Sequence, residues 1–353
     1  MEVRATHPQP RGVQVRQEKV DTNTPKVTVL IPTKNGGAIF EKVLERVVAQ
    51  KTQWPFEILV IDSGSNDNTV ETCRRYPEVR LHTIPPKEFG HGKTRNLGVS
   101  MARSEFVALI TQDALPVNEH WLEAMVAAIE PDPAIAGVFG RHIAHPDANP
   151  FTTHELELHF AGFDAWQLVQ MDDPERYARD QGYRQVLHFF SDNNALIRRS
   201  VWETLPYPDV DFAEDQIWAQ KIIEAGYKKA YARDAVVVHS HNYDLFERLQ
   251  RSFDEAYAFR SLFGYVLCPS PWTLVRSWLA LTRRDLAYAR RSGLFGAQTM
   301  TVLLAPLDNF MRLAGHYLGA RGDRLPKGLR QRLSRDKQLM LGLRAARGKA
   351  ASR

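Results

Sequence analysis

The chain has 353 residues, of which 44% are hydrophobic and 25% charged, and it carries a formal net charge of +5. This composition is that of a soluble globular protein with room for one large domain or two ordinary ones. Only Cys73 and Cys268 are present, without a CxxC pair, which excludes a cysteine-based zinc site and a disulfide framework. A reducing, cytoplasmic environment is therefore expected.

Charge is unevenly distributed along the chain. Residues 246–353 hold 20 basic and 7 acidic residues, a net charge of +13, which leaves a net charge of −8 for residues 1–245. A basic tail behind an acidic body indicates an anionic partner, and both a nucleic acid and a membrane surface fit this pattern. Residues 1–24 are polar and lack an apolar core, so we expect a disordered leader rather than a signal peptide.

Short apolar runs alternate with helical patterns in the first part of the chain. We predict strands over residues 26–31, 56–61, 79–84 and 106–110, and helices over residues 38–50, between 62 and 79, and between 84 and 106. This alternation is typical of an α/β fold with a mostly parallel sheet and helices on both faces. Right-handed crossovers make a doubly wound, Rossmann-like sheet the expected topology.

The second part of the chain is less regular. We predict helices over residues 121–128 and 216–225, and strands over residues 136–139, 186–190, 194–197 and 235–238. Residues 145–185 contain three prolines and are expected to form loops around a short helix. After Tyr243 the pattern is helical and amphipathic, but a proline and two charged residues interrupt residues 296–320, so no membrane-spanning helix is expected. We therefore expect an α/β domain over residues 25–245 and a helical region over residues 246–353.

Two acids lie at or just beyond the ends of predicted buried strands. Asp62 follows the strand 56–61, and Asp113 comes shortly after the strand 106–110. Because ligands bind at the carboxyl ends of the strands in open α/β sheets, Asp62 is a candidate for contacts to a ribose or a base, and Asp113 for contacts to a metal or a substrate. The alternative for each carboxylate is a purely structural role in a turn or a helix cap.

A compact cluster of glycines and cations lies over residues 89–98. His91, Lys93 and Arg95 could bind a diphosphate, and the flanking glycines would let backbone N–H groups approach it. The alternative is a solvated basic turn. The cluster is not a Walker A loop, and residues 32–37 do not match the G-x-G-x-x-G dinucleotide fingerprint.

Further polar groups gather near the end of the predicted α/β domain. Glu214 and Asp215 precede an apolar helix face, where they either favour the helix dipole or form a general base with an orienting neighbour. His239 and His241 follow the last strand at a spacing of two, which in a strand would point them to opposite faces. We therefore expect at most one of them to bind a metal.

Seven segments carry a family pattern: VTVLIPTKNG (27–36), ILVIDSGSND (58–67), EFGHGKTRNLG (88–98), LITQDALP (109–116), GVFGRHIAHPDANP (137–150), FAEDQIWAQ (212–220) and VVVHSHNYD (236–244). Taken in order, they resemble inverting glycosyltransferases of the GT-A fold in family 2, and within that family the rhamnosyltransferase-like group. The resemblance covers about residues 26–245 and extends more weakly into the helical region. It implies a GT-A fold and the transfer of a sugar from a nucleotide-sugar donor.

The resemblance implies a donor site at the carboxyl ends of the first strands. Thr33 and Asp62 fall where the family binds the nucleoside, and Arg95 falls where it reaches the nucleotide phosphates. Arg141 lies at a position that would line the donor pocket.

The resemblance also implies a divalent metal, Mg²⁺ or Mn²⁺, on the diphosphate. Thr111, Gln112 and Asp113 occupy the family's DxD position, and this chain keeps only the last acid. Because one carboxylate leaves the metal with few protein ligands, we expect His239 or His241 to supply another.

Asp215 lies at the position of the family's catalytic base, with Glu214 beside it. The implied mechanism is a single displacement at the anomeric carbon, with inversion, in which Asp215 deprotonates the acceptor hydroxyl. Asp192, Asn193, Asn194 and Trp218 are expected to contact the acceptor or the sugar.

The basic helical region acquires a role from the same resemblance. Members of the group often act on lipid-linked saccharides, so residues 246–353 are expected to bind an anionic membrane surface or to form an oligomer interface. The alternative is a helical cap with a solvated basic face. We expect a cytoplasmic enzyme, peripheral on the inner face of the cytoplasmic membrane. It would use a dTDP- or UDP-sugar, with dTDP-L-rhamnose favoured, and a saccharide or polyprenyl-linked saccharide acceptor, in O-antigen-type cell-surface polysaccharide synthesis.

Two other functions compete with this reading. A nucleotidyltransferase shares a similar sheet, but it would carry a longer Gly-rich, basic loop after the first strand than residues 32–37 provide. A nucleic-acid-binding protein would use the basic tail, but the sequence contains no aromatic-rich binding signature or recognition motif. No nucleic-acid partner is therefore expected.

Overall fold

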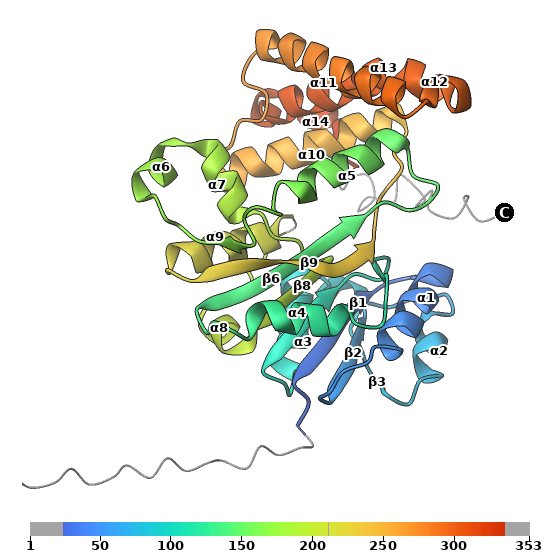
Figure 1. Ribbon diagram of the computed structural model, residues 1–353, viewed down its shortest axis with the longest axis vertical. Helices are drawn as coiled ribbons and strands as arrows, with labels where there is room; N and C mark the ends of the chain where they lie inside the picture. Colours follow the sequence, from blue (N-terminus) through green and yellow to red (C-terminus); the bar gives the residue numbers. More distant parts are fainter. Residues whose placement is uncertain (1–23, 211, 336–353) are drawn as a thin grey trace, which may run out of the picture.

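The structure is a computed structural model that describes residues 24–210 and 212–335 (Figure 1). The predicted leader, apart from Thr24, and the last part of the basic tail, residues 336–353, lie outside the described residues. An α/β body occupies the lower part of Figure 1, and a group of helices from the end of the chain lies above it.

The first half of a nine-stranded sheet is parallel. Its strands are β1 (Val27–Thr33), β2 (Phe56–Asp62), β3 (Val79–Thr83) and β4 (Phe106–Ile110), arranged in the order β3-β2-β1-β4. Every residue of β4 is buried, because helices cover both faces of the sheet, and this explains its uninterrupted apolar sequence. The strand–helix alternation predicted from the sequence is confirmed in this half.

The second half of the sheet is mixed. Its strands are β5 (Leu115–Pro116), β6 (Ile135–Ile143), β7 (Leu168–Val169), β8 (Asn194–Arg198) and β9 (Lys228–Val238). Strand β8 lies antiparallel to both β4 and β6, whereas β6 pairs in parallel with β9. Strands β5 and β7 both pair antiparallel with β9.

Helices cover both faces of the sheet and form two apolar clusters with it. They are α1 (Gly37–Val48), α2 (Thr69–Arg74), α3 (His91–Met101), α4 (Trp121–Ile129), α8 (Arg199–Thr204) and α9 (Glu214–Glu224), with a short 3₁₀ turn η1 (Pro86–Glu88). Alternate side chains of β1 enter the two clusters, with Val29 and Ile31 beside α1 and α4, and Leu30 beside α3 and α9. The sheet therefore separates two apolar cores. The helices leave the ends of the strands uncovered, and a site can form there.

Residues 145–185 contain more helix than predicted. The elements are α5 (Pro150–Ala161), α6 (Pro174–Arg179) and α7 (Gln181–His188). The strand predicted over residues 186–190 is wrong, because most of it belongs to the end of α7. The Asp180 carboxylate accepts hydrogen bonds from the Gly182 and Tyr183 N–H groups and caps this helix, and Tyr183 and Leu187 bury one helical face.

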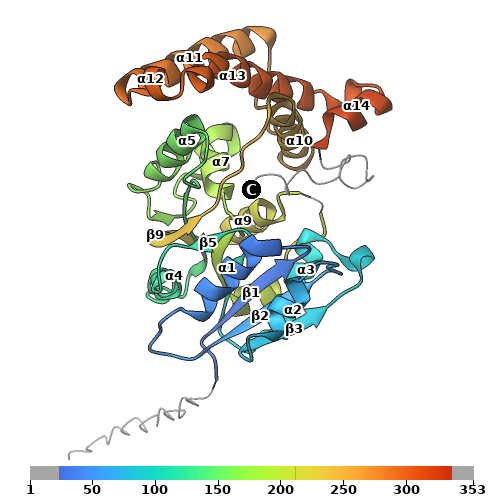
Figure 2. The same cartoon turned by 90° about the vertical axis from the view of Figure 1, so that its right-hand side faces the viewer.

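The C-terminal region is helical, as predicted. It contains α10 (Leu245–Phe263), α11 (Pro271–Arg291), α12 (Leu294–Ala297), α13 (Thr299–Gly319), the 3₁₀ turn η2 (Gly322–Arg324) and α14 (Lys327–Leu333). Helix α13 packs closely on α10, since a Cβ atom at Gly315 would lie 2.4 Å from the Leu249 carbonyl oxygen. Figure 2 shows α11, α12 and α13 lying across the top of the molecule, beyond α10. Within the described residues, no helix combines the length and the apolarity needed to cross a membrane.

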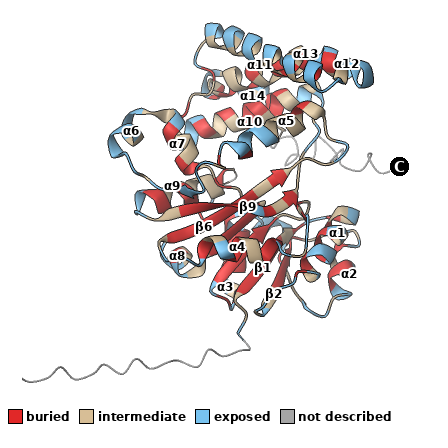
Figure 3. Ribbon diagram, viewed as in Figure 1, coloured by how far each residue is buried: buried red, intermediate tan, exposed pale blue. Residues whose placement is uncertain are grey.

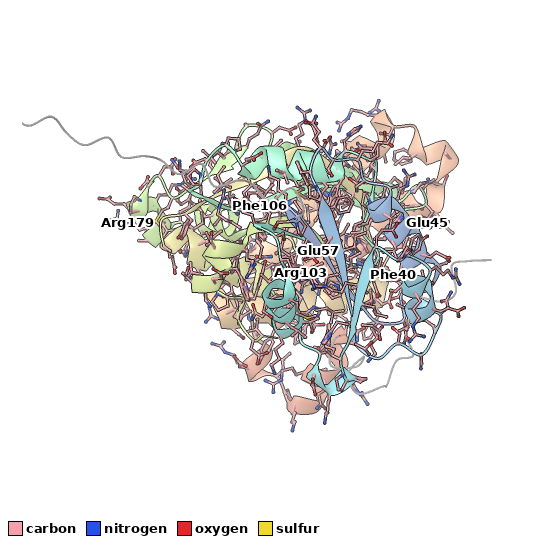
Figure 4. The ribbon with its side chains drawn as sticks, turned by 90° about the horizontal axis from the view of Figure 1, so that it is seen from below. Phe40, Glu45, Glu57, Arg103, Phe106 and Arg179 are labelled. Carbon is pink, nitrogen blue, oxygen red and sulfur yellow. The ribbon has the colours of Figure 1, made fainter. Side chains whose placement is uncertain are left out.

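The amino ends of the parallel strands are closed by structural hydrogen bonds. The Glu57 carboxylate accepts from the Thr28 hydroxyl at 2.7 Å and from the Arg103 N–H group at 3.0 Å. Figure 4 views the molecule from this side, with Glu57, Arg103 and Phe106 labelled near one another. The polar loops singled out by the sequence lie at the opposite, carboxyl ends of the strands.

Candidate active site

Three predicted donor contacts meet at the carboxyl ends of β1, β2 and β4. Thr33 and Asp62 are paired in register, and the Thr33 hydroxyl donates to the Asp62 carboxylate at 3.5 Å. The Gln112 side chain accepts from the Lys34 N–H group at 2.9 Å and donates to the Lys34 carbonyl at 3.3 Å. These two hydrogen bonds connect the loop after β1 with the loop after β4 at the carboxyl edge of the sheet.

The Asp62 carboxylate stabilises its own loop. It accepts from the Gly64 and Ser65 N–H groups, each at 3.0 Å, and from the Ser65 hydroxyl. Gly64 has a φ of +84°, which an L side chain would strain. Asp62 thus has the turn role that was its structural alternative, and its contact with a nucleoside stays a prediction.

Asp113, His239 and His241 form a cluster that can hold a metal ion. One ligand atom from each of the three lies within 4.8 Å of the others, and His239 Nε2 is 3.6 Å from Asp113 Oδ1. Strand pairing explains the approach, because Leu115 in β5 pairs with Val238 at the end of β9. Both histidines lie in this cluster, because β9 ends at Val238 and strand alternation no longer applies beyond it. How many of them bind a metal stays a prediction.

The chemistry of this cluster fits a divalent cation. Burial lowers the pKa of His239. Removal from water by surrounding protein atoms likewise lowers the pKa of His241 to about 4, although part of its side chain is open to solvent. Both imidazoles are therefore neutral near pH 7 and can donate a lone pair. One carboxylate with two imidazoles fits Mn²⁺ better than Mg²⁺, because Mg²⁺ prefers oxygen ligands.

Arg95 lies at the centre of a second, buried cluster. Its Nε is 2.9 Å from Asp192 Oδ2, and its Nη1 donates to Glu214 Oε1 at 2.6 Å. Burial alone would lower the Arg95 pKa, but Asp192, Glu214 and Asp215 together raise it, so the guanidinium stays charged. The guanidinium faces carboxylates of this chain, and its predicted contact with nucleotide phosphates stays a prediction.

Asp215 joins this cluster through the backbone. Its Oδ2 accepts from the Asp192 N–H group at 3.3 Å, while Asp192 accepts from the Tyr207 hydroxyl at 2.9 Å. Burial, with the nearby charges of Glu214 and Asp192, raises the pKa of Asp215 well above its usual value. Since the Glu214 carboxylate is bound to Arg95, Asp215 is the group suited to accept a proton, and Glu214 the group that fixes the helix end.

The structure places three of the predicted acceptor contacts in the core, and one of them, Asp192, is 1% exposed and lies against Arg95 and Tyr207. Trp218 and Asn194 are both 0% exposed. The Trp218 indole donates to the Leu205 carbonyl at 2.8 Å, and the Asn194 amide donates to the Ala235 carbonyl at 2.9 Å. Their assignment as acceptor contacts is therefore wrong, because a fully buried side chain offers no surface to a substrate.

Two other predicted residues keep some exposure. Asn193 lies in the turn before β8 and is partly exposed, so its acceptor contact stays a prediction. Arg141 lies in β6 and is also partly exposed, and its buried Nε has no hydrogen-bond partner within the described part of the chain. An unsatisfied donor of this kind is compatible with its predicted place in the donor pocket.

The roles of Asp192 and Tyr207 in the Arg95 cluster were not predicted. Both residues are buried and lie far from Arg95 in the sequence. The acid beside two asparagines in Ser191-Asp192-Asn193-Asn194 is the one signal the sequence offers, and it does not specify a cationic partner.

Comparisons with known proteins agree on one family. The sequence signature described as Glycosyl transferase family 2 matches residues 28–205. The chain is 34% identical over 314 residues to the O-antigen chain rhamnosyltransferase RfbN of Salmonella typhimurium, an alignment that covers 85% of this chain and 91% of that protein. It is 35% identical over 233 residues to the O-antigen chain rhamnosyltransferase WbaN of Salmonella anatum, covering 65% of this chain and 71% of that protein.

One experimental structure supports the fold. The mannosyltransferase PcManGT from Pyrobaculum calidifontis, in complex with GDP-Man and Mn²⁺, is similar with a TM-score of 0.54 at 22% sequence identity. The match covers 84% of this chain and 86% of that chain. This likeness confirms the predicted GT-A fold.

Replacing Arg95 tests the buried cluster. Arg95→Met should lower the free energy of unfolding by about 3–5 kcal/mol at pH 8, because two buried carboxylates lose their cation. Burial raises the Asp192 pKa to about 7 and Arg95 opposes this rise, so the Asp192 pKa should be higher still in Arg95→Met. Protonation of Asp192 then removes the buried charge that has lost its cation. The destabilisation caused by the substitution should therefore be smaller at pH 5.5 than at pH 8. Urea unfolding at both pH values measures this difference.

Arg75→Met, at an exposed ion pair with Glu41, is the control. It should lower the free energy of unfolding by at most about 1 kcal/mol.

Metal affinity tests the histidine cluster. Asp113→Asn and His239→Ala should each weaken Mn²⁺ binding at least about tenfold, because each removes a ligand. The electron paramagnetic resonance signal of free Mn²⁺ measures the affinity. His120→Ala, at an exposed histidine on the loop before α4, should leave it unchanged. Equal Mn²⁺ affinity in the wild type and in all three variants would show that this cluster does not bind the metal.

Proposed function

The chain belongs to glycosyl transferase family 2, and we propose that it transfers L-rhamnose from dTDP-L-rhamnose to a saccharide hydroxyl in O-antigen-type polysaccharide synthesis. The observation that carries the proposal is the half-buried Asp215 carboxylate, which backbone N–H groups of Asp192 and Gln216 hold beside the Arg95 cluster. The names of the two Salmonella relatives, both O-antigen chain rhamnosyltransferases, favour rhamnose as the transferred sugar.

Asp215 performs the proton transfer in this scheme. The acceptor oxygen attacks the anomeric carbon as Asp215 removes its proton, and the bond from that carbon to the diphosphate breaks. Burial and the charges of Glu214 and Asp192, which raise the pKa of Asp215, also make its carboxylate a stronger base. Backbone N–H groups of Asp192 and Gln216 each donate to one oxygen of Asp215 and thereby orient its carboxylate.

Asp113, His239 and His241 are the residues that would hold the divalent cation. Bound there, Mn²⁺ would neutralise negative charge on the leaving nucleoside diphosphate. The Gln112 side chain is hydrogen-bonded to the Lys34 backbone and thereby fixes the loop after β4, which carries Asp113. Thr33 and Asp62 lie farther along the same sheet edge, where the nucleoside would bind.

The helices at the top of the molecule provide a surface for an anionic membrane. Trp272 and Met300 are each 72% exposed and Leu303 is 65% exposed, and further exposed apolar residues follow on the same helices: Val275, Leu279, Phe295, Leu304, Leu307 and Phe310. Figure 3 shows α11, α12 and α13 with much pale blue, in contrast to the red strands of the sheet. Exposed arginines, among them Arg276 and Arg283, lie on α11 beside these apolar residues. Exposed apolar side chains beside cations suit the interface of an anionic lipid bilayer, where a lipid-linked acceptor would be found.

Asp215→Asn tests the base. The amide cannot accept the acceptor proton, so transfer from dTDP-L-rhamnose should fall at least about 10³-fold, within the range that general bases contribute together with their oriented neighbours. Binding of dTDP with Mn²⁺, measured by calorimetry, should change less than about threefold. Asp209→Asn, at an exposed acid paired with Lys93, serves as the control for a lost surface charge. Normal turnover by Asp215→Asn would refute the assignment.

Vesicle binding tests the membrane surface. Wild-type protein should sediment with vesicles containing phosphatidylglycerol, and the double variant Trp272→Ser, Leu303→Ser should lose at least half of this binding, because apolar area and charge act together. Leu158→Ser, at a residue 47% exposed on α5, should bind as the wild type does. If the double variant instead binds normally but changes its sedimentation coefficient, the helices form an oligomer interface and the membrane assignment is wrong.

A further inference from the structure

A cavity of about 530 Å³ opens beside the first turn of α9. It lies among α5 and the segment that follows it, α7, α9 and α10, and its lining includes Phe163, Trp166, Gln185, Phe189, Gln216 and Glu255. Gln216 directly follows Asp215, so the cavity borders the helix end that carries the base. Its volume lies within the range of sites that enclose small organic ligands.

One wall of the cavity is aromatic. The Phe163 and Phe189 rings stack with centroids 5.2 Å apart, and the His159 ring lies 4.6 Å from Phe189. Trp166 stands beside them and remains 44% exposed, although its backbone N–H donates to the Phe163 carbonyl at 2.9 Å. A large, half-exposed ring on a hydrogen-bonded turn that lines the cavity is available to a ligand.

The other lining groups are polar. Gln185 and Gln216 are both partly exposed, and each amide can donate and accept hydrogen bonds. Glu255 pairs with His316 at 3.3 Å, yet its side chain stays 41% exposed. Aromatic groups and polar groups therefore line the same cavity.

We propose that this cavity binds the acceptor saccharide and that Trp166 stacks on the apolar C–H face of one pyranose ring. This inference rests on the proposed function. A pyranoside has an apolar face for the indole and hydroxyl groups at its rim for Gln185, Gln216 and Glu255. A polyprenyl chain would instead cover the Gln185 and Gln216 amides without offering them hydrogen bonds, which carries a free-energy cost. Gln216 places the cavity beside the first turn of α9, the helix that also carries Asp215.

Saturation-transfer NMR with methyl α-L-rhamnopyranoside and methyl α-D-mannopyranoside tests the cavity without requiring turnover. We expect the wild type to transfer saturation to the C–H protons of at least one glycoside. Trp166→Ala should reduce this signal at least fivefold, whereas Trp166→Phe should keep most of it because a ring remains. Trp272→Ala, at the 72% exposed tryptophan of α11, should leave the signal unchanged.

Kinetics with dTDP-L-rhamnose and the better glycoside separates this inference from the proposed function. Trp166→Ala should raise the acceptor KM at least fivefold while kcat and the donor KM stay within twofold of the wild type. If wild-type transfer occurs and Trp166→Ala changes neither the acceptor KM nor the NMR signal, the cavity assignment is overturned and the proposed function stands. If the NMR signal depends on Trp166 but wild-type protein transfers no rhamnose, saccharide binding in the cavity is supported and the proposed donor or reaction fails.

Discussion

The buried charge of Arg95 is the constraint on which the site depends. A guanidinium with little solvent contact needs carboxylates around it, and they come from Asp192 before β8 and from Glu214 at the start of α9. Burying these charges offsets much of the energy gained by pairing them, so the pair contributes little to net stability. Its main consequence is geometric, because it joins α3, the β8 turn and α9 at one point. Asp215 is thereby held beside Asp192, where its pKa is raised.

The mixed second half of the sheet brings the candidate metal ligands together. Strands β8 and β6 lie between β4 and β9, so Asp113 and His239 would be separated if each stayed at the end of its own strand. The short strand β5 removes this separation, because the chain after Asp113 crosses over and pairs with the end of β9. The parallel half meanwhile carries Thr33 and Asp62 at neighbouring strand ends. The predicted donor contacts and the candidate metal ligands therefore come from different parts of one sheet.

The sequence predicted well where a local pattern had one structural meaning. The apolar run of β4 could only be a buried strand, and the proximity of Asp113 to a histidine after the last strand followed from the family resemblance. It failed where the outcome depended on distant packing. The pattern around Trp218 does not reveal that its helix face is covered by the sheet, and the carboxylates that bind Arg95 are contributed by segments far along the chain. The helix α7 was missed because its end falls in the apolar run of residues 186–190, which also fits a short buried strand.

The central claim is that one carboxylate, Asp215, promotes a single displacement at the anomeric carbon. The configuration of the first product formed tests it most directly, and NMR coupling constants of the anomeric carbon and hydrogen measure that configuration during turnover of dTDP-β-L-rhamnose. The account predicts an α-L-rhamnosyl product, because attack from the face opposite the diphosphate inverts the centre. A β-L-rhamnosyl product would require two displacements or attack from the face of the leaving group, and it would contradict the account.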